Sequence, residues 1–404
     1  MKRIGIYGGA FNPPHVGHMR GAKYLMQVLQ LDRLVLMPSC VSPHKAAPAH
    51  SPTPIQRLQM LQIAAADLAD VTVSDLELHR GGISYTVDTL AQMQAMEPDA
   101  RLVLCMGTDM FLSFMDWREP ERILKMADLA VLYRGMKEEQ EQVARQRAVL
   151  EQMGATVYTV ENRVTEISST DLRRLVSFGC TDAFLPEGVG QYIRDHQLYG
   201  LGQSYRNLPI EQLEEAVISL LKPSRVKHVL GCRQTAVELA RHWGADEVDA
   251  ARAGLLHDIT KALDGPLQLT LCRAHGTMLD DFSTQNPKTL HALTGALVAQ
   301  TIFGENDAVV SAIRSHTTGK ANMNLLEKII YVADYMEPNR DFPGVGELRD
   351  LAFSDIDLAL KTGLEMTIAM LRLQKREISR ESQEALEWLD SMKKTPERED
   401  TIEC

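Results

Sequence analysis

Two different spacings of apolar residues divide this sequence near residue 200. Before that point, short apolar runs typical of β-strands alternate with segments in which apolar residues recur at helical spacing. The strand candidates are residues 3–7, 33–37, 71–76, 101–106, 129–133 and 156–160. Such alternation predicts an α/β domain in which crossover helices join the strands of a parallel sheet.

After residue 200 the strand-like runs nearly vanish, which predicts an all-α helical bundle. The glycine-rich, polar stretch YGLGQSY at 199–205 marks the change. A chain of 404 residues also exceeds the size, about 250–300 residues, at which a single core stops growing. We therefore predict a first domain at 1–200, a linker at 201–207, a second domain at 208–392 and a polar tail at 393–404. Loops are expected at 263–266, 280–287 and 337–346.

Charge and cysteine content narrow the classes of function. A formal net charge of -11 works against the large phosphate-neutralising surface that long nucleic acids require, whereas small nucleotides are not excluded. The six cysteines include no C-x-x-C pair, and no run approaches the roughly 18–20 apolar residues of a membrane span. We therefore expect a cytoplasmic protein that binds neither long nucleic acid nor membrane.

The first strand leads into a motif suited to phosphate, residues 8–18, GGAFNPPHVGH, before a helix expected to run to about residue 29. Gly8 and Gly9 allow close approach of the backbone to phosphate, and the helix start offers unpaired N–H groups. The segment has neither a Walker lysine nor G-x-G-x-x-G. Instead, His15 and His18 could donate hydrogen bonds to phosphate oxygens, although histidines in a turn can also be purely structural.

A second motif of this kind lies at residues 167–174, ISSTDLRR. The hydroxyl residues Ser168 and Ser169 stand at an expected helix start, about one turn before Arg173. Helix capping alone would also explain these serines.

Together, the two motifs resemble those of the nucleotidyltransferase superfamily, which implies a Rossmann-like parallel-sheet fold. The rest of the first half is similar to its nicotinate-nucleotide adenylyltransferase branch. The supporting segments are 43–45 (PHK), 83–90 (ISYTVDTL), 106–109 (MGTD), 117–118 (WR) and 192–199.

This resemblance implies that the phosphate of nicotinate mononucleotide attacks the α-phosphorus of ATP and releases pyrophosphate. It also implies Mg²⁺ carried with ATP, and catalysis by His15, His18, Lys45 and Arg173. The implied ATP-binding residues are Gly8, Gly9, Phe11, His15, His18, Ser168, Ser169 and Arg173. The implied substrate-binding residues are Thr86, Asp109, Trp117 and Arg118. Trp117 could instead be a core aromatic residue, and another phosphorylated acceptor, such as phosphopantetheine, would use the same phosphate motifs.

The second half contains dispersed histidines and aspartates in helical or helix-edge segments. The candidates are His228, His257, Asp258, His291, His316 and Asp334. Ligands so far apart in sequence can meet only if several helices converge, each projecting one side chain into the bundle. A mixed imidazole and carboxylate set favours Fe, Mn, Co or Zn over calcium. Any one of these histidines could also be an ordinary core or surface residue.

This set resembles that of the HD-domain phosphohydrolases, in particular the YqeK-like branch that splits diadenosine tetraphosphate symmetrically into two ADP. The supporting segments are 253–258 (AGLLHD), 316–319 (HTTG), 327–338 (EKIIYVADYMEP) and 340–345 (RDFPGV). The resemblance implies that His228, His257, Asp258 and Asp334 hold one metal, and that His291 and His316 hold a second. Asp258 could bridge the two and carry a catalytic role.

Lys261 and Arg340 are expected phosphate contacts, or else solvated surface charges. The sequence thus predicts a bifunctional enzyme of NAD biosynthesis whose partners are ATP, nicotinate mononucleotide and diadenosine tetraphosphate. Its second half could alternatively hydrolyse another phosphorylated nucleotide or act as a nucleotide sensor. A homo-oligomer is compatible with the sequence.

Overall fold

The computed structural model describes residues 1–43, 51–133, 137–161, 167–180, 183–201 and 204–392. Lys45 and the polar tail predicted at 393–404 lie outside these residues. The chain divides into two compact units, Met1–Gly202 and Gln203–Cys404.

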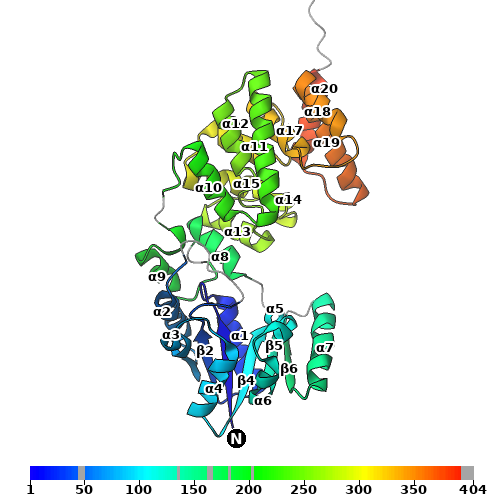
Figure 1. The fold of residues 1–404 in the computed structure, drawn as a ribbon. Helices are drawn as coiled ribbons and strands as arrows, with labels where there is room; N and C mark the ends of the chain where they lie inside the picture. Colours follow the sequence, from blue (N-terminus) through cyan, green and yellow to red (C-terminus); the bar gives the residue numbers. More distant parts are fainter. Residues whose placement is uncertain (44–50, 134–136, 162–166, 181–182, 202–203, 393–404) are drawn as a thin grey trace, which may run out of the picture. The chain divides into compact units, whose positions relative to one another are not determined.

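The first unit is built on a sheet whose six described strands are all parallel, in the order β3-β2-β1-β4-β5-β6 (Figure 1). The strands are β1 (Lys2–Gly9), β2 (Arg33–Pro38), β3 (Val71–Val73), β4 (Ala100–Gly107), β5 (Ala127–Tyr133) and β6 (Val157–Glu161). This topology confirms the predicted α/β fold. The strand order reverses between β1 and β4, and ligands of such sheets bind beside the carboxyl ends of the strands at that point.

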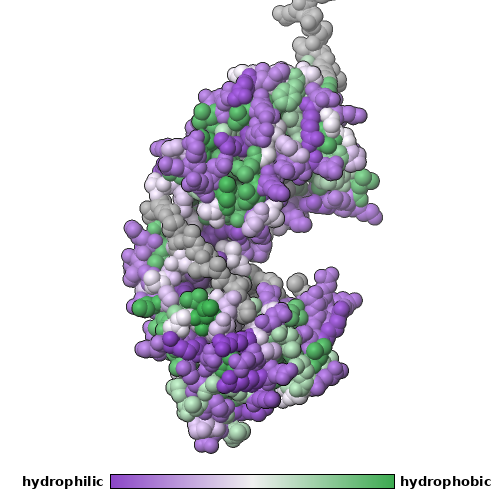
Figure 2. Space-filling model, viewed as in Figure 1, coloured by the Kyte–Doolittle hydropathy of each residue, from purple (hydrophilic) through white to green (hydrophobic). Residues whose placement is uncertain are grey.

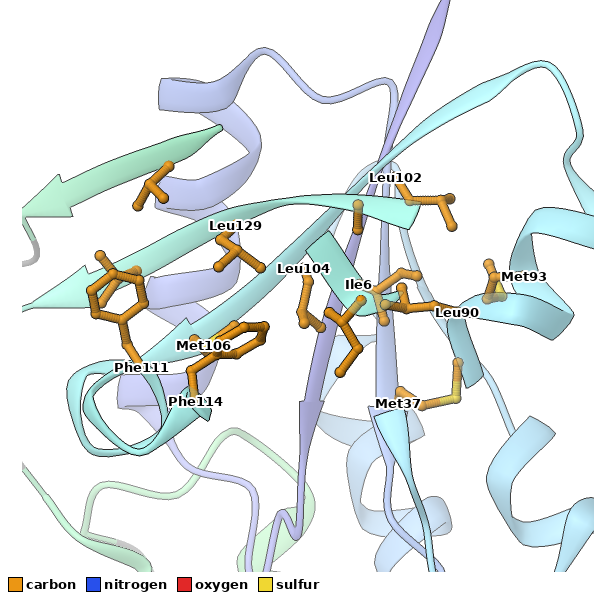
Figure 3. Packing of buried hydrophobic residues seen from close by; sticks show 14 of the residues in the cluster. Ile6, Met37, Leu90, Met93, Leu102, Leu104, Met106, Phe111, Phe114 and Leu129 are labelled. Carbon is orange, nitrogen blue, oxygen red and sulfur yellow. The ribbon is translucent and has the colours of Figure 1, made fainter. Parts of the chain in front are cut away.

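The sheet is buried on both faces, as expected for parallel strands covered by helices. Side chains of β4 alternate between two apolar clusters: Leu102, Leu104 and Met106 pack into one, Val103 and Cys105 into the other. Figure 3 shows the first cluster, in which Leu90 and Met93 of helix α4 (Thr86–Met96) pack on the same side of the sheet as Ile6 and Leu104. The two clusters hold the sheet between its helices and fix the strand ends where the site forms.

The helices of the first unit follow the strands in chain order. They are α1 (Val16–Leu29), α2 (Pro54–Ala65), α3 (Leu76–Arg80), α4 (Thr86–Met96), α5 (Thr108–Leu112), η1 (Phe114–Asp116), α6 (Pro120–Met126), α7 (Lys137–Gln152), α8 (Ser169–Ser177), α9 (Val189–Asp195) and η2 (Leu198–Gly200). The prediction of a strand to residue 76 was wrong at its end. The Leu76 N–H donates to Ser74 Oγ (3.3 Å) and Leu76 begins α3, so the polar pair Ser74 and Asp75 turns the chain out of the sheet.

The second unit confirms the predicted all-α domain. Its helices are α10 (Ile210–Leu220), α11 (Pro223–Trp243), α12 (Glu247–Leu256), α13 (Gly265–Ala274), α14 (Asp281–Gln285), α15 (Leu290–Val298), η3 (Ala299–Phe303), α16 (Asp307–Ser315), α17 (Leu325–Met336), α18 (Val345–Ser354), α19 (Ile356–Leu373) and α20 (Arg380–Met392).

Helices begin inside all three segments predicted as loops. Two of these helices start at an N-cap aspartate: the Asp264 carboxylate accepts from the Leu267 N–H, and the Asp280 carboxylate accepts from the Ser283 N–H. A side-chain oxygen in that position satisfies an otherwise unpaired N–H group and so favours a helix in a polar stretch.

Hydrophilic residues cover most of the visible face of each unit, with hydrophobic residues in smaller patches (Figure 2). In the described part of the chain no helix combines the length and the apolar character needed to cross a membrane.

Candidate functional sites

The glycine motif follows β1 at the carboxyl edge of the sheet. Gly8 and Gly9 are the last residues of β1, and the Phe11 ring is buried, with its centroid 5.0 Å from that of His18. His15 and His18 lie at the start of α1 with stacked rings, their centroids 3.6 Å apart. The His15 backbone N–H donates to His18 Nδ1 at 3.3 Å, which orients the His18 ring at the start of the helix.

Both imidazoles are neutral at physiological pH. Burial lowers the pKa of His15 to about 4 and, together with the neighbouring His15, holds the pKa of His18 well below its usual range. The His15 Nδ1 atom is buried and has no hydrogen-bond partner among the described residues. Unpaired buried polar atoms are costly, so this atom is available for a bound ligand.

The second motif of the first unit lies directly against the first. Arg173 of α8 donates to the Asn12 carbonyl (2.7 Å), and the Ser169 hydroxyl donates to the Pro13 carbonyl (3.3 Å). The Tyr199 hydroxyl donates to Asn12 Oδ1 (2.8 Å). Ser168 is the N-cap of α8, because its hydroxyl accepts from the Asp171 N–H (3.1 Å). Of the three hydroxyl and guanidinium residues predicted to bind ATP, Ser169 and Arg173 therefore contact the first motif, and Ser168 caps the helix.

The four predicted substrate-binding residues lie in the segments that follow β3 and β4. Thr86 is the first residue of α4, and Asp109 is an exposed residue in the first turn of α5. The Trp117 ring is half-buried with its centroid 5.4 Å from that of Phe114. The Arg118 guanidinium lies 4.6 Å from the centroid of the Tyr85 ring, next to Thr86. The structure thus brings the segments 83–90 and 117–118 into contact.

In the second unit, the six predicted metal ligands meet inside the helical bundle. His228 comes from α11, His257 and Asp258 from the end of α12, His291 from α15, His316 from the end of α16 and Asp334 from α17. The His228, His257, His291 and Asp258 side chains are buried, as is that of His316. These positions form two groups, His228 with His257 and Asp258, and Asp258 with His291 and His316, in which the ligand atoms lie within 4.8 Å of one another.

All four histidines present Nε2 to the centre, because a hydrogen bond fixes each Nδ1. The Nδ1 of His257 lies 2.7 Å from the Gly254 carbonyl, and that of His316 lies 2.6 Å from the Ile313 carbonyl. The Nδ1 of His291 lies 2.8 Å from the Lys288 carbonyl, and that of His228 lies 3.1 Å from Glu337 Oε1. Since these partners are all acceptors, a proton on each Nδ1 would leave each Nε2 its lone pair, which is how metal-binding histidines are usually oriented.

Asp258 lies between the two groups of histidines. Its Oδ2 is 3.6 Å from His228 Nε2 and 3.8 Å from His257 Nε2, whereas its Oδ1 is 3.5 Å from His291 Nε2 and 3.7 Å from His316 Nε2. Asp334 Oδ1 lies 3.1 Å from His228 Nε2 on the first side. One carboxylate oxygen therefore faces each histidine pair, as a bridging ligand requires.

The electrostatics of this centre fit a cation. Oδ1 of Asp258 is buried without a hydrogen-bond partner in the described residues, and Nε2 of His228 lies only 3.2 Å from Nε2 of His257. Burial lowers the pKa of His257 to about 4 and, with Lys261, that of His291 to about 3. Burial opposes ionisation of Asp258, but His257, His316 and Lys261 outweigh it and hold the pKa well below its usual range. Burial acts to lower the pKa of His228, but hydrogen bonds with Asp334 and Glu337 outweigh it and raise that pKa. Neutral imidazoles, as at His257 and His291, and an ionised carboxylate are the protonation states that bind metal.

Comparison with known proteins shows which family the first half of the chain belongs to. Residues 6–175 match the cytidylyltransferase-like family model. A probable nicotinate-nucleotide adenylyltransferase of Hydrogenovibrio crunogenus is 36% identical over 204 residues, which cover 48% of this chain and 97% of that protein. Another, of Desulfatibacillum aliphaticivorans, is 35% identical over 219 residues and is covered over 99% of its length. The first half of the chain belongs to the nicotinate-nucleotide adenylyltransferase family.

The half that follows this adenylyltransferase unit contains an HD domain, whose family model matches residues 225–339. A solved structure from Clostridium acetobutylicum, described as a predicted HD superfamily hydrolase involved in NAD metabolism, is 38% identical to this chain. It covers 46% of the chain and is itself covered over 98%, with a TM-score of 0.45. The six ligand candidates lie within the matched HD segment.

Three residues of the HD domain contact these ligand candidates but could not be singled out from the sequence. Arg225, three residues before His228, has its guanidinium 3.4 Å from Asp258 Oδ2. The Glu337 carboxylate, which is 1% exposed, orients His228, and the Thr317 hydroxyl lies 3.0 Å from Nε2 of His291. Thr317 and Glu337 lie in the segments 316–319 and 327–338 that carry the family resemblance, but residue type alone gives none of the three a role; their burial and contacts do.

The two predicted phosphate contacts lie beside the ligand candidates. Lys261 Nζ is 2.7 Å from Nε2 of His291, and Arg340 pairs with Asp334 Oδ1 at 2.7 Å. Together with Arg225, they place three cationic groups around the two aspartates.

Proposed function

We propose that the adenylyltransferase unit transfers AMP from ATP to nicotinate mononucleotide, giving deamido-NAD and pyrophosphate. The contact between the motifs at 8–18 and 167–174, at the carboxyl end of β1, carries this proposal. Membership of the family supports the choice of nicotinate mononucleotide as acceptor.

In this reaction the protein acts by positioning and by charge stabilisation. The start of α1, His15 and His18 would hold the ATP phosphates through N–H groups, and Arg173 would add a positive charge. The segments at 83–90 and 117–118 would hold the acceptor with its phosphate near the α-phosphorus, so that attack needs no covalent enzyme intermediate. Magnesium bound with ATP would neutralise charge on the phosphates. Lys45 is a further proposed phosphate contact.

Pyrophosphate release from ATP, measured with nicotinate mononucleotide or with phosphopantetheine as acceptor, tests the first activity. We expect turnover with nicotinate mononucleotide, and a loss of about 10²-fold or more in His18→Ala. Turnover with phosphopantetheine alone would assign a different acceptor.

We further propose that the HD domain hydrolyses diadenosine tetraphosphate to two ADP, using two divalent metals chosen from Fe, Mn, Co and Zn. The position of Asp258, with one oxygen facing each histidine pair, carries this proposal. His228, His257, Asp258 and Asp334 would hold one metal, and His291, His316 and Asp258 the other. A metal pair supplies Lewis acidity and a hydroxide near neutral pH. Lys261, Arg225 and Arg340 would hold phosphate oxygens of the substrate.

Incubation with diadenosine tetraphosphate and each metal in turn, followed by chromatography, tests the second activity. Two ADP as products, lost in Asp258→Ala, are the expected outcome. ATP together with AMP would show asymmetric cleavage. Absence of turnover with every metal would instead favour another phosphorylated nucleotide as substrate, or a sensor that binds without hydrolysis.

A further inference from the structure

Arg57 of α2 is an arginine whose side chain is fixed entirely by main-chain carbonyl groups in the described part of the chain. The residue is only 6% exposed. Its guanidinium donates to the Ala10 carbonyl (2.7 Å), the Ser39 carbonyl (2.6 Å) and the Cys40 carbonyl (3.0 Å). Among the described residues no carboxylate pairs with it, so the planar fork of the guanidinium serves to hold two backbone segments together.

The two segments belong to different halves of the proposed reaction site. Ala10 lies in the ATP motif at 8–18. Ser39 and Cys40 follow β2, and this segment is bonded to the acceptor motif at 83–90. The Cys40 N–H donates to Ser84 Oγ (2.9 Å), and the Ser84 N–H donates to the Val41 carbonyl (2.9 Å). A continuous chain of short hydrogen bonds therefore runs from the ATP motif through Arg57 to the segment that contains Thr86.

We propose that Arg57 is a positioning residue, which fixes the ATP motif relative to the acceptor motif in adenylyl transfer. The inference rests on the proposed transfer activity. The described hydrogen bonds of the Arg57 guanidinium all go to main-chain carbonyls of the two segments, so loss of Arg57 would leave the side chains of both motifs in place. The relative position of the two phosphates is what changes. Displacement of reacting groups by about 1 Å costs on the order of 10²-fold in rate.

The proposal predicts a separation of catalysis from binding. In Arg57→Ala, kcat should fall about 100-fold, while the Kd of ATP and that of nicotinate mononucleotide, each measured alone, change less than about threefold. Added guanidinium ion at millimolar concentration should restore part of kcat by filling the vacated position. Arg57→Lys keeps the positive charge but lacks the planar guanidinium group that can bond three carbonyls at once. Its kcat should be reduced and should not respond to guanidinium.

Arg3→Ala is the matched control. Arg3 also donates to a main-chain carbonyl, that of Leu29 (2.7 Å), but from the amino end of β1, away from both motifs. The Arg3→Ala variant should lose about as much stability as Arg57→Ala. Its kcat should stay at the wild-type value and should not respond to guanidinium.

Three results would overturn the proposal: an unchanged kcat in Arg57→Ala, a Kd for either substrate raised more than tenfold at constant kcat, or an equal loss of kcat in Arg3→Ala. If Arg57→Ala does not fold, Arg57→Lys decides the question by the same comparison of kcat with Kd. Failure of the proposed function has a different signature, because the wild-type protein itself would then form no deamido-NAD.

Discussion

Single side chains in both units are oriented by hydrogen bonds that leave one particular atom for a ligand. In the HD domain, the main-chain carbonyls of Gly254 and Ile313 fix Nδ1 of His257 and His316, and thereby direct each Nε2 inward. In the adenylyltransferase unit, His15 Nδ1 remains unpaired among the described residues. The cost of burying these groups is offset only when the intended ligand binds.

Burial of His15 makes the adenylyltransferase unit less stable in acid. Its pKa falls from 6.5 to about 4 on folding, so between these values the unfolded chain binds a proton that the folded chain does not. Unfolding free energy should therefore drop as pH is lowered from 7 to 5, by about 2 kcal/mol through His15 alone. Hydrogen exchange of peptides from β1 and β4 should show a smaller drop in His15→Asn. An identical pH dependence in both proteins would contradict this.

Glu337 is expected to raise metal affinity without contacting the metal. Its Oε1 accepts from His228 Nδ1, and it is itself held by the Asn339 N–H (2.7 Å). Loss of such an outer partner typically costs 10–100-fold in metal affinity. Titration of Glu337→Gln with Mn²⁺ or Zn²⁺ should show a fall of roughly that size. Glu327 is a buried glutamate in α17, the helix that ends just before Glu337, and it pairs with Lys320. Glu327→Gln should therefore bind metal as the wild type does. Equal losses in both variants would count against the role of Glu337.

At the scale of elements, α11 needs a glycine where it passes Glu337. A Cβ on Gly231 would overlap the Glu337 carboxylate, whereas a Cβ on Gly346 in α18 would meet nothing within 4 Å. Alanine in place of glycine favours a helix by about 0.5–1 kcal/mol when nothing else changes. Gly346→Ala should thus raise the melting temperature, and Gly231→Ala should lower both that temperature and the affinity for Mn²⁺. A Gly231→Ala variant that binds metal normally would show that Glu337 can move at no cost.

The elements differ in how far the sequence predicts them. Strands β1, β2, β4, β5 and β6 are apolar runs bounded by polar residues, and burial on both faces imposes that pattern. The start of α13 and the whole of α14 lie in segments predicted as loops, because each start depends on one capping bond, from Asp264 or Asp280, in an otherwise polar stretch. An aspartate in such a stretch can cap a helix or form a turn, and the sequence alone does not decide between the two.

The site residues also divide into those that a sequence pattern predicts and those that depend on a contact in the fold. Both phosphate motifs and the dispersed histidines could be predicted from residue type and family resemblance. Arg57 and Glu337 could not, since each acts through a fold-dependent contact with residues far along the chain. A buried arginine and a surface arginine look alike in a single sequence, and only the fold shows that one of them binds three carbonyls.

At the scale of the whole chain, each site is built from residues of one unit, so the two activities should be separable by metal removal. Treatment with a chelator, followed by dialysis into Mg²⁺, should abolish hydrolysis of diadenosine tetraphosphate, because the histidine and carboxylate set favours transition metals over magnesium. Deamido-NAD formation should persist in the same sample, since its site offers no metal group in the described residues. Adding back Fe, Mn, Co or Zn should restore hydrolysis, except in Asp258→Asn. A transfer rate that falls in step with the metal content would show that the units are coupled, and would make metal loading of the HD domain a regulator of the adenylyltransferase unit.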